Sequence, residues 1–105
     1  MAKSNAKAFL NVEMNQLDRA AEIMRALSHP LRMKIMGFID KNKSVNVNKI
    51  YNTLGLEQSI TSQHLRILRK VDLVKTKRDG KFIYYSLNYD KIRKVNKMME
   101  KYDIV

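Results

Sequence analysis

The stretch from Asn48 to Leu73, NKIYNTLGLEQSITSQHLRILRKVDL, constrains the fold more than any other. Its apolar residues recur with a helical period on both sides of Gly55, and a glycine can take the left-handed conformation that ends one helix shortly before another begins. We therefore predict a helix-turn-helix pattern whose second helix covers residues 58–71.

That second helix separates into two faces when its residues are placed at about 100° each on a helical wheel. The inward arc is predicted to hold Ile60, His64, Ile67, Leu68 and Val71, with Thr61 and Leu65 at its edge. The outward arc holds Ser59, Ser62, Gln63, Arg66, Arg69 and Lys70. The outward face is polar and basic and carries no acidic residue.

The order of the outward side chains suits insertion into the major groove of DNA, which needs short hydrogen-bonding groups at the base edges and cations beside the phosphates. We predict that the short side chains of Ser59, Ser62 and Gln63 meet base edges, and that the long cations, which begin with Arg66, pass the phosphates. Arg69 and Lys70 are predicted to contact phosphates. The alternative is an ordinary solvated helix face. A DNA-binding face is favoured because three features all fit DNA binding: the turn, the outward face with basic but no acidic residues, and the basic hairpin that follows.

Two β-rich runs, residues 73–78 and 81–87, flank an Asp79-Gly80 pair. This is a strong hairpin signal, and we expect a type I′ turn with positive φ at both central residues. The tip carries Lys77, Arg78 and Lys81. A basic hairpin directly after a helix-turn-helix predicts a wing, over residues 77–81, that reaches phosphates or the minor groove. The alternative is a hairpin with solubilising lysines at its edge.

The aromatic residues of this hairpin, Phe82, Tyr84 and Tyr85, are expected to pack on the core. They would then offer no exposed platform for stacking single-stranded RNA, which makes that function a weaker alternative.

Two outer segments, residues 9–27 and 88–102, share seven-residue apolar spacing. Segment 9–27 has further apolar residues beside the face formed by this seven-residue spacing. One apolar face can therefore pack on the protein's own core and the other on a second copy of the chain. The predicted dimer contacts are Leu10, Met14, Leu17, Ala21, Met24, Ile92, Val95, Met99 and Tyr102. The alternative is one broad core-facing stripe.

Between these segments, Ser28-His29-Pro30 predicts a helix stop and start, because serine caps helices and proline fits only their first turn. His29 is expected to be a cap or surface residue rather than a ligand. The next helix should reach about Lys41, and residues 44–47 alternate like one short strand.

The composition agrees with one small domain that binds a polyanion. The 105 residues are 45% hydrophobic and carry a net charge of +11, which points to nucleic acid or an acidic membrane surface. There is no cysteine, so disulfides, thiolate metal sites and cysteine nucleophiles are excluded. No signal peptide or membrane-spanning run is present, and we expect a cytoplasmic protein that does not associate with membranes.

Three segments together resemble the arsenic-repressor (ArsR/SmtB) family of bacterial winged helix-turn-helix regulators: ALSHPLRMKIM from Ala26, LGLEQSITSQHLRILRKVDLV from Leu54, and RDGKFIYYSLN from Arg78. The resemblance implies a mainly α-helical winged helix-turn-helix domain with a small β-hairpin, spanning residues 1–105. Its elements would follow the order two helices, a short strand, two helices, two strands and a final helix. It also implies a homodimer that pairs through its outer helices. The DNA-reading residues that the resemblance implies are Ser59, Ser62, Gln63 and Arg66, with Arg78 and Lys81 on the wing.

The sequence departs from the family pattern at three places. Tyr51 and Asp72 stand where many relatives have a small residue and a glycine. The family's metal-sensing cysteine pair and histidine set are absent, since the last helical segment and its end offer only Asp90, Glu100 and Asp103. Carboxylates alone make a poor transition-metal site, so we expect no metal and no cofactor. His64 is expected to be a packed, hydrogen-bonded structural residue.

The expected function is therefore a sequence-specific regulator of transcription, with repression favoured, that binds an inverted-repeat operator in double-stranded DNA as a homodimer. An unidentified small molecule or protein could be its effector. The alternative is an architectural or protein-interaction module that holds nucleic acid without sequence preference. An enzyme is not expected, because no nucleophile-base pair or phosphate-binding loop can be assembled.

Overall fold

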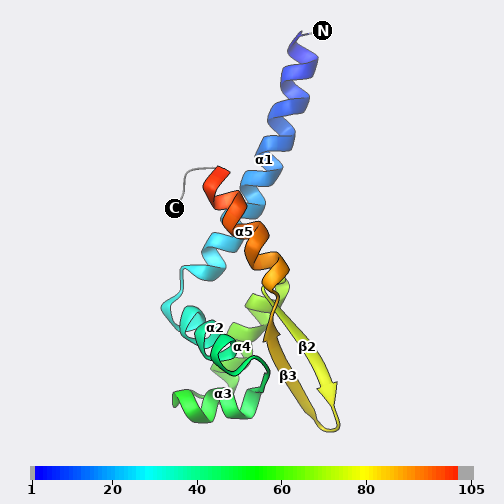
Figure 1. The fold of residues 1–105 in the computed structure, drawn as a ribbon. Coiled ribbons are helices and arrows are strands. Elements are labelled where there is room, and N and C mark those ends of the chain that lie inside the picture. The colour runs from blue at the N-terminus through cyan, green and yellow to red at the C-terminus, as the bar shows by residue number, and fades with distance from the viewer. Residues whose placement is uncertain (1, 102–105) are drawn as a thin grey trace.

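A computed structural model describes the backbone of residues 2–101 and the side chains of residues 14–101. Its elements are α1 (Ala2–Leu27), α2 (Pro30–Asn42), β1 (Val45–Asn46), α3 (Val47–Leu54), α4 (Gln58–Lys70), β2 (Val74–Asp79), β3 (Phe82–Leu87) and α5 (Tyr89–Lys101). Figure 1 shows a helical domain with one projecting hairpin. The predicted fold and element order are confirmed. The first helix begins seven residues earlier than the predicted residue 9, at residue 2.

The sheet has the strand order β1-β3-β2, and both pairs are antiparallel. The prediction of a type I′ turn around Asp79-Gly80 is wrong. Asp79 pairs with Phe82, so the two central residues are Gly80 and Lys81. Gly80 has a φ of 64°, whereas Lys81 is not among the residues with positive φ. Positive φ at the first central residue alone is the pattern of a type II′ turn, which also matches the twist of a hairpin.

The core lies where α2, α3 and α4 meet the base of the hairpin. Its fully buried side chains are Ile35, Ile39, Ile50, Leu65, Leu68, Leu73, Val74 and Thr61. The predicted inward arc of α4 was wrong in its orientation. Ile60 and Ile67 are exposed, whereas Thr61, predicted to lie at the edge of the arc, is completely buried. The core-facing arc is thus rotated by roughly 90° on the wheel.

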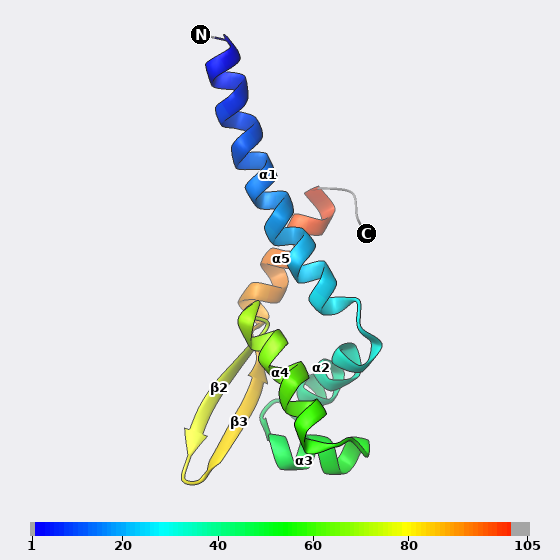
Figure 2. The same ribbon diagram turned by 180° about the vertical axis from the view of Figure 1, so that it is seen from behind.

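Helix α1 extends well beyond the domain, and α5 lies beside its middle part, as Figures 1 and 2 both show. The molecule measures 59 × 27 × 22 Å as a result. Ala20, Ile23 and Ala26 are the side chains through which the described part of α1 buries itself on its own domain. Lys101 at the end of α5 donates a hydrogen bond to Gln16 of α1, with Nζ and Oε1 3.0 Å apart.

The junction between α1 and α2 is capped by His29, as predicted, but Ser28 does not cap α2. His29 is the N-cap of α2, and its Nδ1 accepts a hydrogen bond from the amide of Leu31 at 3.2 Å. Ser28 instead serves the preceding helix, because its hydroxyl donates to the carbonyl of Arg25 at 3.0 Å. Pro30 occupies the first turn of α2, where its missing amide hydrogen costs no helical hydrogen bond.

Candidate nucleic-acid interface

The turn between α3 and α4 is built on Gly55, which has a φ of 67°. The next amide, that of Leu56, donates to the carbonyl of Tyr51 at 2.9 Å and closes the end of α3. Tyr51 is half-buried, and its bulk is accommodated without loss of the helix-turn-helix geometry. The turn sets α4 across α3, with α2 behind them (Figure 2).

The rotation of α4 defines which predicted base-reading residues point outward. Ser59, Gln63 and Arg66 are exposed, and they lie opposite the buried face that contains Thr61. Ser62 is half-buried at the edge of that outward face. The structure therefore brings the four predicted base-reading residues onto one side of α4, with Gln63 close to its centre.

The N-terminal part of α4 lies at the same end of the domain as α3 and the tip of the hairpin. Both ribbon views place these three elements at the end farthest from the N-terminus of α1. A helix end and a hairpin tip on one side of a domain can meet one DNA duplex at the same time.

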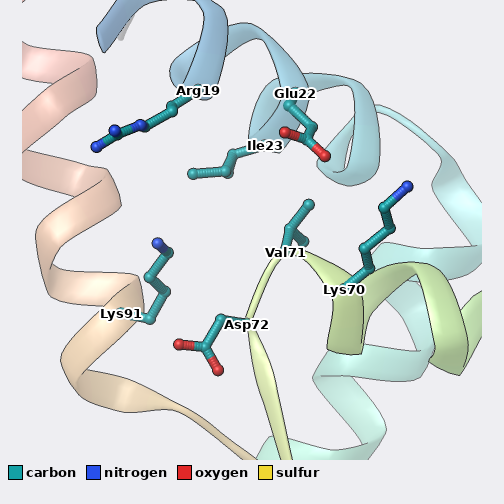
Figure 3. A pocket seen from close by; sticks show the side chains of 7 residues that line it. All are labelled: Arg19, Glu22, Ile23, Lys70, Val71, Asp72 and Lys91. Carbon is teal, nitrogen blue, oxygen red and sulfur yellow. The ribbon is translucent and has the colours of Figure 1, made fainter. Parts of the chain in front are cut away.

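Arg69 and Lys70 are exposed but lie at the other end of α4. Lys70 lies eleven positions after Ser59 along the helix, a rise of about 17 Å. Lys70 lines a cavity together with Arg19 and Glu22 of α1, as Figure 3 shows. The structure therefore does not group Lys70 with the base-reading residues.

The hairpin carries its three predicted cations in different directions. Directly paired residues of antiparallel strands share a face, so Lys77 lies on the face of Tyr84 and Arg78 on the face of Ile83. Lys81 is in the turn itself. All three cations are exposed, and Arg78 also donates from Nε to the carbonyl of Gly80 at 3.3 Å.

Phe82 corrects the expectation that the hairpin aromatics pack on the core. Its side chain is 39% exposed, and neighbouring Ile83 is 45% exposed on the opposite face. Tyr84 and Tyr85 are half-buried, and Tyr85 packs against the core. The Phe82 and Tyr84 rings meet edge to face, with centroids 6.5 Å apart. The sequence analysis did not predict that Phe82 and Ile83 are exposed. The hairpin register could have indicated it, because both residues pair close to the hairpin tip, away from the core.

His64 lies on the side of α4 that faces α2, with its ring centroid 4.6 Å from that of His29. The expectation that it is hydrogen-bonded is wrong for Nδ1, which is buried without a hydrogen-bond partner. Burial, followed by the charges of His29 and Arg32, lowers the pKa of His64 below its usual value. We find no ligand role for this residue.

Nowhere in the part of the chain that the structure describes do three potential metal-ligating side chains gather. Within the same part of the chain, no helix combines the length and hydrophobicity needed to cross a membrane.

The arrangement of α3, α4 and the hairpin defines a winged helix-turn-helix DNA-binding protein. Known proteins agree: a family model described as "Bacterial regulatory protein, arsR family" matches residues 29–76. Transcriptional repressor PagR of Bacillus anthracis is 38% identical over 88 residues, which are 84% of this chain and 88% of PagR. The PagR crystal structure has a TM-score of 0.66 and covers 79% of this chain and 94% of its own.

Two other solved structures share the fold. NolR from Sinorhizobium fredii is 33% identical with a TM-score of 0.70, covering 86% of this chain and 90% of NolR. A homodimeric winged helix-turn-helix DNA-binding domain from Mycobacterium bovis is 24% identical with a TM-score of 0.72, covering 87% of this chain and 84% of that one. The chain therefore belongs to the ArsR family of bacterial transcriptional regulators.

Proposed function

We propose that this protein is a homodimeric transcriptional repressor that binds an inverted-repeat operator through α4 and the wing. One observation carries the proposal: the N-terminal part of α4, with its exposed polar residues, and the cationic hairpin tip lie at the same end of the domain. Repression is inferred from PagR and from the transcriptional repressor SdpR of Bacillus subtilis, which is 33% identical over 66 residues. Such a regulator acts in the cytoplasm, where bacterial DNA lies.

The contacts are proposed to divide by side-chain length and position. Ser59, Ser62, Gln63 and Arg66 reach base edges, because they lie on the part of α4 that would enter the major groove. Arg69, Lys77, Arg78 and Lys81 neutralise phosphates and supply most of the affinity. Lys70 is left out of this set because it lies beside α1.

The second copy is proposed to cover the exposed apolar side of α1. Met14 is 56% exposed and Leu17 is 40% exposed. At about 100° per residue, Met14 lies opposite the buried Ile23, and Leu17 lies between Met14 and Ala20. Among the other predicted contacts, Ala21 is exposed and Met24 half-buried. A two-fold axis through this surface would present two α4 helices to successive major grooves, about 34 Å apart.

The predicted contacts of α5 need revision in this proposal. Val95 is 3% exposed within the single chain and belongs to its own core, so it is left out of the interface. Ile92 and Met99 are half-buried against the same core and keep some surface for a partner. The side chain of Leu10 and the whole of Tyr102 lie outside the described residues.

Selection of bound fragments from a genomic library, followed by anisotropy titrations on the selected site, tests this function. Gln63→Ala should change the preferred site, at a cost of about 1–3 kcal/mol on the original one. Arg78→Ala should weaken binding to all DNA and make the salt dependence less steep. Lys34→Ala, on the exposed side of α2, is the control. Equal binding of all fragments would instead support the architectural alternative.

A further inference from the structure

A small cavity lies between α1, α5 and the turn that follows α4. Its volume is about 160 Å³, and it is lined by Arg19, Glu22, Ile23, Lys70, Val71, Asp72 and Lys91. Figure 3 shows these side chains arranged around the opening, with α1 on one side and α5 on another. For a comparison of size alone, benzene fits a cavity of about 150 Å³. The space therefore suits a small organic molecule.

The charged groups around the cavity are unpaired. Arg19, Lys70 and Lys91 are cations, and Glu22 and Asp72 are carboxylates. None of the five side chains makes a hydrogen bond or ion pair with another described residue; the ion pairs found among residues 14–101 join Lys43 to Asp40 and Arg93 to Asp90. Three cations against two carboxylates leave one net positive charge, which a monoanion would neutralise.

The cavity is also amphipathic. Ile23 is 4% exposed and points into the space in Figure 3, and Val71, directly after α4, also lines it. Arg19 and Lys91 extend from α1 and α5 toward the same side of the opening. A ligand that presents a carboxylate to these two cations can therefore lay a short hydrocarbon body against Ile23 and Val71. Burying that body adds about 25 cal/mol for each Å² of apolar surface removed from water.

We propose that this cavity binds a small organic carboxylate with a short aliphatic body and that the ligand controls DNA binding. The binding step is independent of the proposed function, whereas the control of DNA binding rests on it. The position supports the control, because the cavity joins the outer helices to Val71 and Asp72, directly after α4. A bound molecule would hold the end of the recognition helix against α1 and α5. If the ligand binds more tightly to one orientation of α4 relative to α1 and α5, it shifts the protein toward that orientation and so changes the affinity for the operator.

Calorimetry with 4-methylpentanoate as the probe, at constant ionic strength, tests the binding step. We expect saturable binding at one site per chain. Acetate, which lacks the hydrocarbon body, and 4-methylpentylamine, which has the same body with the opposite charge, should bind at least about tenfold more weakly, the ratio expected when one favourable contact is lost. If acetate binds as tightly as 4-methylpentanoate, the protein attracts anions in general, and the proposal is overturned.

Variants locate the site. Arg19→Gln and Lys91→Gln should each weaken 4-methylpentanoate binding about tenfold, as expected for loss of one charge-assisted contact. Lys34→Gln removes the same charge from the exposed side of α2 and should leave binding unchanged. A loss in Lys34→Gln as large as in Lys91→Gln would contradict the assignment. Circular dichroism at the titration temperature confirms that each variant is folded.

The control of DNA binding is tested separately, on the DNA fragment that the protein selects. Saturating 4-methylpentanoate should change the Kd for that fragment at least fivefold in the native protein, and in Arg19→Gln the same change should require about tenfold more ligand. If the ligand binds but the Kd does not change, the regulatory part is wrong and the binding site stands. If no fragment is selected at all, the proposed function fails, whatever the calorimetry shows.

Discussion

Asn88 ties the end of the recognition helix to the start of α5. Its Nδ2 donates a hydrogen bond to the main-chain carbonyl of Asp72 at 3.0 Å. Its Oδ1 accepts from the amide of Lys91 at 3.3 Å, as an N-cap of α5 does. The side chain is largely buried, so both contacts are shielded from water. The side chain of Asn88 thus links the end of α4 to the start of α5.

Asp72 itself occupies a conformation that glycine would adopt more easily. Its φ is 65°, and its amide donates to the carbonyl of Arg69 at 3.0 Å. The amide of Leu73 donates to Leu68 at 3.0 Å, so the end of α4 is a Schellman motif. The left-handed conformation costs an L residue about 1–2 kcal/mol, less for aspartate than for most.

We therefore predict that Asp72→Gly stabilises the protein by about 0.5 kcal/mol. Glycine removes the backbone strain at position 72, and this gain exceeds the free-energy cost of the greater conformational entropy that glycine gives the unfolded chain. Asp72→Val should destabilise it by more than about 1 kcal/mol. Urea unfolding of the three proteins at equal concentration measures both. A less stable Asp72→Gly variant would show that the aspartate side chain contributes more than its backbone costs.

Asn88→Ala removes both hydrogen bonds of the link and should lower the free energy of unfolding by about 2 kcal/mol. Asn88→Asp keeps the capping oxygen and loses only the donor to Asp72, so it should lie between the alanine variant and the native protein. Chemical unfolding gives the ranking. If the aspartate variant matches the native protein, the contact with Asp72 contributes nothing.

The order of helices and strands could be predicted because several residues in the chain each favour one particular local structure. Gly55 permits the left-handed turn, Pro30 starts a helix, and the Asp79-Gly80 pair marks a hairpin. Such local signals do not depend on which surfaces later meet. The left-handed turn at Asp72 could be inferred only from the family, since no local rule requires positive φ for an aspartate.

The orientation of α4 could not be predicted in the same way. A wheel ranks faces by hydrophobicity alone, and Ile60 and Ile67 outweigh a threonine. In the structure Thr61 is buried because its hydroxyl donates to the carbonyl of Glu57 at 2.9 Å, which satisfies its polar group inside the helix. The choice of face therefore depended on contacts with α3 and the hairpin, which follow from tertiary packing.

Phe82 is predicted to contribute to DNA binding rather than to stability. Its exposed ring lies beside the basic wing tip, where an apolar side chain can contact sugars or enter between base steps in the minor groove. Phe82→Ala should change the free energy of unfolding by less than about 0.5 kcal/mol and weaken DNA binding about tenfold. Anisotropy titration measures the second effect. Unchanged affinity with lower stability would assign the ring to packing on Tyr84.

His64 predicts an acid-sensitive stability. Its folded pKa is lowered, chiefly by burial, so the unfolded chain binds a proton more readily than the folded one. The stability linked to His64 is therefore fully present above the unfolded pKa of 6.5 and is lost as the pH falls toward the lower folded value. Urea unfolding at pH 7.5 and 5.0 should show a larger loss for the native protein than for His64→Gln. Parallel losses in the two proteins would contradict this.

The proposed dimer gives the last prediction, because a carboxylate buried in an apolar contact without a partner is costly. Leu17→Glu should halve the mass measured by sedimentation equilibrium, to the 12.3 kDa of one chain, and abolish selective DNA binding. Asn15→Glu adds the same charge on another exposed face of α1 and should leave the dimer intact. If both variants stay dimeric, the copies pair through a different surface. If Leu17→Glu is monomeric yet binds the selected site unchanged, one chain suffices for recognition and the inverted-repeat operator is wrong.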